Sequence, residues 1–484
     1  MDIILQVAPL VPEISLMLGA ITLLMLGVFA GEKAAHGIHK LGVMLPLAVA
    51  VIITFDPLEA EPGATWLMGA GMLSVDHFSQ IMKSLLLVAA SFSLYMAPRY
   101  LEQQGTLKIE YPVLIALSCL GMMVMVSANN FLTVYVGLEL QSLALYVLAS
   151  FRRDDLRSTE AGLKYFVLGA LASGFLLYGI SLLYGLTGSI DFAGVSAVLA
   201  TTPDSFAARM ALLFILVALA FKISAAPFHM WTPDVYQGAP TPVTAFFSVA
   251  PKVAAMGLMV RVLYGPLLEM SADWQKVLIV LSALSMAVGA FAALGQTNLK
   301  RLLAYSSIGH VGFMLMGLAC ANQTGGEAML VYLSTYLVMS LTAFAVLLSM
   351  RTNGQPLEEI KDLAGLSRSR PGLAAGMALV MFSMAGIPPL VGFFTKVYVL
   401  LAAAQSGLMP LAVLGVVMSV VSAFYYIRIV KVMYFDEPAP AYDRGFDTGV
   451  GVVLVTGGVF TLAGLIFITA ISYMASYAFQ TFYP

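Results

Sequence analysis

Residues 221–252 read FKISAAPFHMWTPDVYQGAPTPVTAFFSVAPK. The stretch is largely apolar, yet Lys222 lies near its start and Lys252 ends it. Pro227 and Pro233 interrupt the apolar run, and proline in a helix removes a backbone donor and clashes with the preceding turn. The stretch therefore predicts a broken helix followed by a second helix, each carrying a lysine in an apolar setting.

The composition outside this stretch is that of a membrane protein. The chain has 484 residues, of which 60% are hydrophobic and 10% are charged, whereas soluble proteins carry roughly 25% charged residues. Many apolar runs are long enough to cross a hydrocarbon core of about 30 Å as a helix. Because lipid offers no partners for backbone polar groups, such runs are expected to be helical. The net charge of −2 and the absence of a basic block give no sign of a nucleic-acid partner.

The fold class predicted is an all-α membrane protein with about fourteen transmembrane helices. Gly386, Pro388, Pro389 and Gly392 make the twelfth helix, like the seventh, a candidate for a break. The expected helices span residues 9–30, 37–55, 73–98, 109–127, 129–150, 158–186, 206–237, 240–266, 274–294, 298–320, 327–350, 371–404, 408–435 and 448–479.

The loops between these helices differ in charge on the two sides. Basic residues concentrate after helices 1, 3, 5, 9, 11 and 13, as in the run Arg152 and Arg153, whereas acidic residues such as Asp56 and Glu59 lie in the opposite loops. Lys and Arg are enriched in cytoplasmic loops. Both chain termini are therefore expected on the periplasmic side.

An internal repeat is suggested by three matched segments. The motif EAGLKY at residues 160–165 resembles EAMLVY at residues 327–332, and the segment RVLY at residues 261–264 resembles KVMY at residues 431–434. Phe221 and Pro227 match Phe382 and Pro388. A repeat of five helices, an odd number, must be inverted, and inverted repeats with broken helices are a transporter architecture. We expect helices 1–3 in residues 1–108, one five-helix repeat in 109–266, the second in 267–435 and helix 14 in 436–484.

Several ionisable residues fall well inside these predicted helices. A central lysine costs about 3 kcal/mol on the membrane-insertion scale, and intramembrane ionisable residues are functional candidates by default. We assign proton translocation to six of them: Glu139, Lys164, Lys222, Lys252, His310 and Lys396. Forming or breaking a Glu139–Lys222 pair would load or unload a proton, because burial disfavours a charged lysine and a nearby carboxylate favours it.

Some of these residues have simpler explanations. Lys164 lies about two turns from a basic loop, so it could extend to the membrane surface. The deeper charges could form static ion pairs, and His310 could be a hydrogen-bonded core residue. Lys83 could pair with Asp76, seven residues earlier on the same helix face. No metal site is expected from His36 and His39, and lone buried thiols are expected for Cys119 and Cys320.

The opening stretch also resembles a known family signature. Its segment WTPDVYQGAPTPVTAF is similar to the antiporter-like subunits of respiratory complex I, in particular to the bacterial subunit N family and its relative, mitochondrial subunit 2. The resemblance covers essentially the whole chain. It implies the fourteen-helix fold with inverted bundles at helices 4–8 and 9–13.

The resemblance also implies roles and partners. Glu139, Lys222, Lys164 and Lys252 stand at the family's helix 5, 7, 6 and 8 positions, Lys396 stands at the helix 12 position, and His310 is a looser match. A chain of this family would bind no cofactor itself. NADH, FMN, iron–sulfur clusters and ubiquinone would belong to partner subunits, which agrees with the lack of a Gly-rich dinucleotide motif or a cysteine cluster.

The expected surroundings are a bacterial inner membrane, other membrane-arm subunits, protons and internal water. Two alternatives remain open at this point. One is a subunit of a multi-subunit cation/proton antiporter that has no redox partner. The other is a membrane scaffold in which the buried charges are structural.

Overall fold

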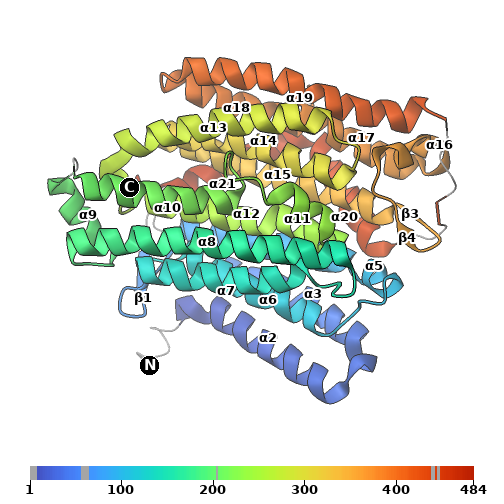
Figure 1. The fold of residues 1–484 in the computed structure, drawn as a ribbon, viewed down its shortest axis with the longest axis horizontal. Helices are drawn as coiled ribbons and strands as arrows, with labels where there is room; N and C mark the ends of the chain where they lie inside the picture. The colour runs from blue at the N-terminus through green and yellow to red at the C-terminus, as the bar shows by residue number, and fades with distance from the viewer. Residues whose placement is uncertain (1–7, 56–64, 203–204, 438–441, 444–446, 484) are drawn as a thin grey trace.

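The computed structural model describes residues 8–55, 65–202, 205–437, 442–443 and 447–483. Figure 1 shows long helices lying roughly parallel, with α2 at one edge and α19 at the other. Helix α9 and strand β1 lie at one end of the helices, and α5, α16 and the β3–β4 hairpin lie at the opposite end (Figure 1). The predicted all-α membrane fold is confirmed, and the strands that the structure describes are short.

In the N-terminal part, helices α2 and α4 both pack against α3. Its elements are η1 (Ala8–Leu10), α2 (Val11–Ala30), η2 (Glu32–Ala34), α3 (Ala35–Thr54), the antiparallel strands β1 (Thr65–Met68) and β2 (Leu73–Asp76), α4 (His77–Met96) and α5 (Pro98–Gln103).

The two segments predicted to be repeats follow in order. The first contains α6 (Glu110–Val126), α7 (Phe131–Ala149), α8 (Leu156–Thr187), α9 (Phe192–Thr201), α10 (Phe206–Ile223), α11 (Thr232–Gly238) and α12 (Thr241–Leu263). The second contains η3 (Leu268–Met270), α13 (Ser271–Leu294), α14 (Leu299–Ala319), α15 (Gln323–Ser349), β3 (Arg351–Thr352), β4 (Gln355–Pro356), η4 (Ile360–Leu363), α16 (Leu366–Ser369), α17 (Pro371–Ala385), α18 (Val391–Gln405) and α19 (Met409–Phe435). Helices α20 (Thr448–Leu462) and α21 (Gly464–Phe479) end the fold.

Within the described residues, eleven helices are long and apolar enough to cross a membrane, or up to twelve if α20 and α21 form one span. Helix α6 and the pair α17–α18, which the sequence-based count includes, are shorter apolar helices. The count of about fourteen therefore stays a prediction.

Both expected breaks are present. Helix α10 ends at Ile223 and α11 begins at Thr232, while α17 ends at Ala385 and α18 begins at Val391. Each first half ends in a left-handed residue, Ser224 with φ 65° and Gly386 with φ 87°. The breaks expose backbone carbonyls in the interior of the protein.

The two breaks are closed by the same hydrogen bond. Ala225 N donates to Ala220 O at 2.8 Å, and Ile387 N donates to Phe382 O at 3.0 Å. Corresponding residues of the two bonds are 162 positions apart in the sequence, one more than the separation between Phe221 and Phe382, which the repeat hypothesis pairs.

A second pair of matching contacts lies between neighbouring helices. A Cβ on Gly121 in α6 would meet Gln141 N and Gly137 O in α7 at 2.4 and 2.7 Å. A Cβ on Gly289 in α13 would meet Gly309 N and Tyr305 O in α14 at 2.4 and 2.8 Å. The corresponding positions are each 168 residues apart: Gly121 and Gly289, Gln141 and Gly309, and Gly137 and Tyr305. These contacts support the repeat hypothesis, which stays a prediction for the segments as wholes.

The central helices carry the deepest residues. All 23 residues of α12 are buried, and α14 and α15 are nearly as enclosed. Helices at the edges, such as α2 and α19, instead present large apolar side chains outward. The interior therefore lies between the two segments, where Lys252 and His310 are placed.

Two of the expected spans differ in detail from the structure. The helix expected from residue 73 begins at His77, because Leu73–Asp76 pairs with β1 and the Asp76 carboxylate caps the helix by accepting from Ser79 N at 2.8 Å. The last span, expected to be continuous over 448–479, bends by 88° between α20 and α21. Gly464 at this bend lies directly against Val391 at the start of α18, where a Cβ would meet Val391 Cβ at 2.5 Å.

Candidate proton-translocation site

Lys222 lies at the end of α10, one residue before the helix stops, and faces α7. Its Nζ donates to Ser142 Oγ at 2.7 Å and lies 5.9 Å from the ring centre of Tyr146. Glu139 is one turn before Ser142 on α7, and its buried Oε1 has no hydrogen-bond partner among the residues that the structure describes. Among the described residues no ion pair joins Glu139 to Lys222; the serine takes the place of the expected carboxylate.

Lys252 connects the two segments. It projects from α12, and its Nζ donates to Ser307 Oγ in α14 at 2.6 Å. The rings of Tyr236 and Tyr336 lie 5.5 and 5.9 Å from the ammonium. Aromatic faces stabilise a desolvated cation, so this lysine is held by one hydroxyl and two rings.

His310 lies one turn after Ser307 on α14 and is hydrogen-bonded at both ring nitrogens. Its Nδ1 is 2.7 Å from Tyr332 OH, and its Nε2 is 3.0 Å from Tyr426 OH. Tyr426 OH is also 2.6 Å from Ser306 Oγ. Hydroxyl groups both donate and accept, so this cluster can exchange protons in either direction.

Lys396 lies on α18, just after the second break. Its Nζ donates to Ala385 O at 3.1 Å and to Ser419 Oγ at 2.9 Å, and the ring centre of Phe313 is 5.4 Å away. Ala385 is the last residue of α17, so the break itself supplies the carbonyl. The broken helix therefore provides a hydrogen-bonding group that a continuous helix would use internally.

The three deep lysines share one kind of partner. Each ammonium group donates to a serine hydroxyl: Lys222 to Ser142, Lys252 to Ser307 and Lys396 to Ser419. Their exposed fractions are 7%, 2% and 6%. A neutral amine keeps two N–H groups, so it can still donate to the serine oxygen that accepts from the ammonium. Each lysine thus keeps a partner in both protonation states.

Other buried cations are paired with carboxylates. Lys83 binds Glu13 at 2.6 Å, which corrects the expected pairing of Lys83 with Asp76. Asp76 instead accepts two hydrogen bonds from Arg261, at 2.5 and 2.9 Å. The sequence-based pairing failed because it considered one helix only, whereas both true partners come from distant segments.

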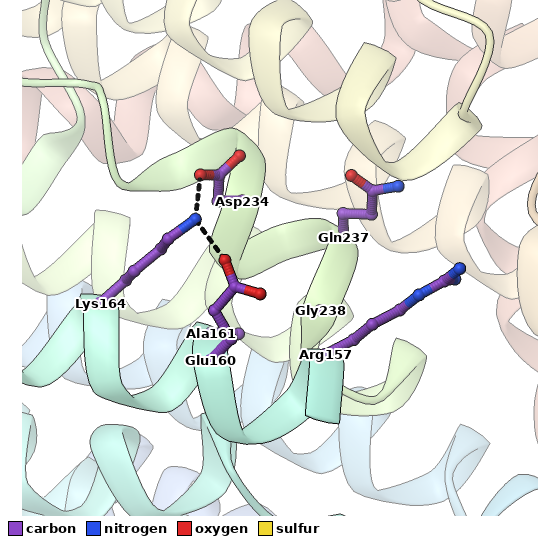
Figure 2. Close-up of a pocket in the computed structure, with 7 residues that line it drawn as sticks. All are labelled: Arg157, Glu160, Ala161, Lys164, Asp234, Gln237 and Gly238. Atoms are coloured by element: carbon purple, nitrogen blue, oxygen red, sulfur yellow. Dashed lines mark hydrogen bonds and ion pairs between the residues drawn. The ribbon is translucent and has the colours of Figure 1, made fainter. Parts of the chain in front are cut away.

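Lys164 differs from the other assigned lysines. Its side chain is 42% exposed, and its Nζ binds Glu160 at 2.7 Å and Asp234 at 2.8 Å (Figure 2). Lys164 therefore lies at the edge of the fold. This position agrees with the simpler explanation that its side chain extends to the membrane surface. The residue beside it, Tyr165, packs against Tyr146, which in turn lies under Lys222.

The hydroxyl partners were missed by sequence reasoning. Serine and tyrosine in apolar helices carry no specific signal, because most such hydroxyls bond to backbone carbonyls of their own helix, as Ser334 does with Leu330 O. The spacing of Ser307 and His310 along α14 did not indicate that the two side chains bind different neighbours, Lys252 and Tyr332. The missed residues are Ser142, Ser306, Ser307, Tyr332, Ser419 and Tyr426.

Known membrane proteins resemble this chain in sequence. Residues 128–422 match the family described as NADH:quinone oxidoreductase/Mrp antiporter, TM. NADH-quinone oxidoreductase subunit N of Paramagnetospirillum magneticum is 49% identical over 485 residues, covering 99% of this chain and 99% of that protein. This chain belongs to the subunit N family. All six assigned residues, from Glu139 to Lys396, fall within the matched region.

Two solved structures share this fold at different levels of sequence identity. A chain of respiratory complex I from Thermus thermophilus with bound aureothin aligns with a TM-score of 0.81 and 34% identity, covering 96% of this chain and 99% of that one. A chain of the Mrp complex from Dietzia sp. DQ12-45-1b aligns with a TM-score of 0.83 but only 21% identity, covering 98% and 97%. The second likeness shows a shared fold alone, so the sequence, and not the backbone, places the chain in the subunit N family.

Proposed function

We propose that this chain is the membrane-arm, antiporter-like subunit N of a proton-pumping NADH:quinone oxidoreductase. It would move protons while quinone is reduced elsewhere in the complex, and it would bind no redox group itself. NADH, FMN, iron–sulfur clusters and ubiquinone would belong to partner subunits. The observation that carries the proposal is the series of buried lysines and a histidine, each held by hydroxyl groups, that extends from α10 through α12 and α14 to α18.

Proton movement follows from the partners of each group. Glu139 lies one helical turn before Ser142, the hydrogen-bond partner of Lys222, and its Oε1 has no hydrogen-bond partner in the described part of the chain. When Glu139 is ionised it favours the ammonium form of Lys222; when it is protonated, that support is lost and Lys222 can release its proton. Ser142 Oγ can accept from Lys222 in either protonation state, so proton release need not break this hydrogen bond.

The remaining groups would continue the transfer. Lys252 bonds to Ser307 on the same helix that carries His310, and His310 has a tyrosine at each nitrogen. A histidine can take a proton at one nitrogen and give one up at the other. Lys396, beyond the second break, would be the last charged group of this series, with water needed between the separated side chains.

The proposed setting is a bacterial inner membrane with other membrane-arm subunits as neighbours. We place both termini on the periplasmic side, because basic residues collect in the loops at the end of the fold that carries α5, α16 and the β3–β4 hairpin. We also propose that residues 109–266 and 267–435 act as the two inverted units. The similar closure of the two helix breaks supports that division.

The proposal is tested by charge removal in the assembled complex. Lys222→Ala and Glu139→Ala should each lower NADH-driven quinone reduction and proton pumping together, while flavin and iron–sulfur proteins still co-purify with the chain. A mutant that pumps fully at normal turnover would show that its residue has no such role. Purification of the native chain without redox proteins would favour the cation/proton antiporter alternative.

A further inference from the structure

A charged cavity lies beside Lys164, at the end of α8 nearest the basic loops. Its volume is about 200 Å³, and it is lined by Arg157, Glu160, Ala161, Lys164, Asp234, Gln237 and Gly238 (Figure 2). Figure 2 shows the Lys164 ammonium between the carboxylates of Asp234 and Glu160. Lys164 is therefore held at the cavity and not directed toward Lys222.

Asp234 binds a second cation with its other oxygen. Oδ2 accepts from Lys164 Nζ at 2.8 Å, while Oδ1 accepts from Arg301 Nη1 at 2.6 Å. Lys164 belongs to α8 in the first segment, and Arg301 belongs to α14 in the second. One carboxylate on the short helix α11 thus bridges the two segments.

The first turn of α14 also contacts Ala239, the residue that directly follows α11. Lys300, next to Arg301, donates to Ala239 O at 2.9 Å and binds Glu358 at 2.9 Å, and its side chain is only 2% exposed. Further along the same helix lie Ser307, the partner of Lys252, and His310. A displacement of α14 during proton transfer would therefore reach Asp234 directly.

We propose that Asp234 is a positioning residue that holds Lys164 at the cavity and links the position of Lys164 to α14 through Arg301. A carboxylate shared by two cations binds each less firmly than it would bind one alone, so loss or approach of Arg301 changes its hold on Lys164. The inference rests on the proposed function, since the effect of Lys164 would act on the nearby Glu139–Lys222 site. The packing of Tyr165 against Tyr146 gives the contact between the two places.

The experiment measures NADH-driven quinone reduction and proton pumping in membranes at matched complex content. Asp234→Asn should lower turnover by about threefold, the size expected for one partly exposed ion pair. Asp234→Glu should restore most of it. In a Lys164→Met background, Asp234→Asn should cause no further loss, because the lysine on which it acts is gone.

Glu160→Gln is the matched control. Glu160 also binds Lys164, at 2.7 Å, but its side chain is 56% exposed. Within the described residues it makes no hydrogen bond or ion pair with the second segment. Its loss should be smaller than that of Asp234→Asn. Equal losses would refute the link to α14.

Arg301→Gln repeats the test without altering Asp234, in case Asp234→Asn reduces assembly. It should lower turnover when Lys164 is present and have no effect in the Lys164→Met background. Losses that add in either double mutant would mean that the cluster only holds the segments together, and would overturn the inference. Full pumping in Lys222→Ala would instead refute the proposed function, so the two failures are distinguishable.

Discussion

Ser142→Ala tests whether a hydroxyl is what lets Lys222 hold a proton inside the membrane. The Ser142 side chain is fully buried, and its Oγ lies 2.7 Å from Lys222 Nζ. The substitution removes one oxygen and leaves the shape of α7 nearly unchanged. In the described part of the chain, Lys222 then keeps the ring of Tyr146, 5.9 Å from its ammonium, as the contact that stabilises its charge.

The expected size follows from the bond that is lost. A hydrogen bond to a charged group contributes about 1.5–3 kcal/mol, which corresponds to about a ten- to hundredfold fall in the population of the bonded ammonium form. The Tyr146 ring faces the ammonium in both proteins, so its contribution cancels in the comparison. We therefore expect turnover to fall by at least about threefold.

The assay compares NADH-driven quinone reduction and proton pumping in membranes with equal amounts of complex. Ser118→Ala is the control, because Ser118 in α6 is equally buried but its hydroxyl has no partner in the described part of the chain. Ser142→Thr, which keeps the hydroxyl, should restore most of the activity. If Ser142→Ala matched Ser118→Ala in both rate and pumping, Lys222 would not depend on the serine and the proposed role of the hydroxyl partners would be refuted.

Two further predictions concern other buried cations. Lys396→Ala should lower the rate of quinone reduction by at least about threefold. Lys396→Arg should be milder, because it keeps a positive charge near Ala385 O and Ser419. Equal and complete loss in both variants would show that proton release at this position is obligatory. Arg261→Met should reduce assembly of the complex, measured as the amount of this chain in membranes. The substitution leaves the fully buried Asp76 without its bidentate partner, at a cost of about 3–5 kcal/mol. A normal amount of the chain would show that Asp76 is not charged in the folded protein.

Local signals in the sequence predicted the features that depend on local chemistry. Pro227 and Pro388 lie in the two helix breaks, where proline cannot donate a backbone hydrogen bond. Proline alone does not decide a break, since Pro46 and Pro251 lie within the continuous helices α3 and α12. The depth of Lys222, Lys252 and Lys396 followed from the length of the apolar runs around them, and all three are buried. The family followed from a single long motif.

Features that depend on tertiary packing were not predictable in this way. The bend between α20 and α21 contains no proline and depends on the fit of Gly464 against Val391. The pairing of Lys83 with Glu13 joins α4 to α2 and has no periodic signature. Lys164 shows the same limit, because the sequence placed it two turns from a loop but gave no hint of Asp234, 70 residues away, as its partner.

The partners of the buried cations divide them into two classes by what each partner allows. Arg261, Lys83 and Lys300 bind carboxylates, and removing a proton or a partner from such a pair leaves a buried charge that costs several kcal/mol. These pairs hold their charge fixed and therefore suit a structural role.

Lys222, Lys252 and Lys396 bind serines, which stay bonded whether the lysine is charged or neutral. The cost of changing protonation is then the desolvation of one charge, which a nearby Glu139 or an incoming proton can alter. A membrane protein that moves protons needs groups whose charge can change without loss of a hydrogen bond. The partner of each lysine, more than its depth, therefore separates the residues proposed to carry protons from those that hold the helices together.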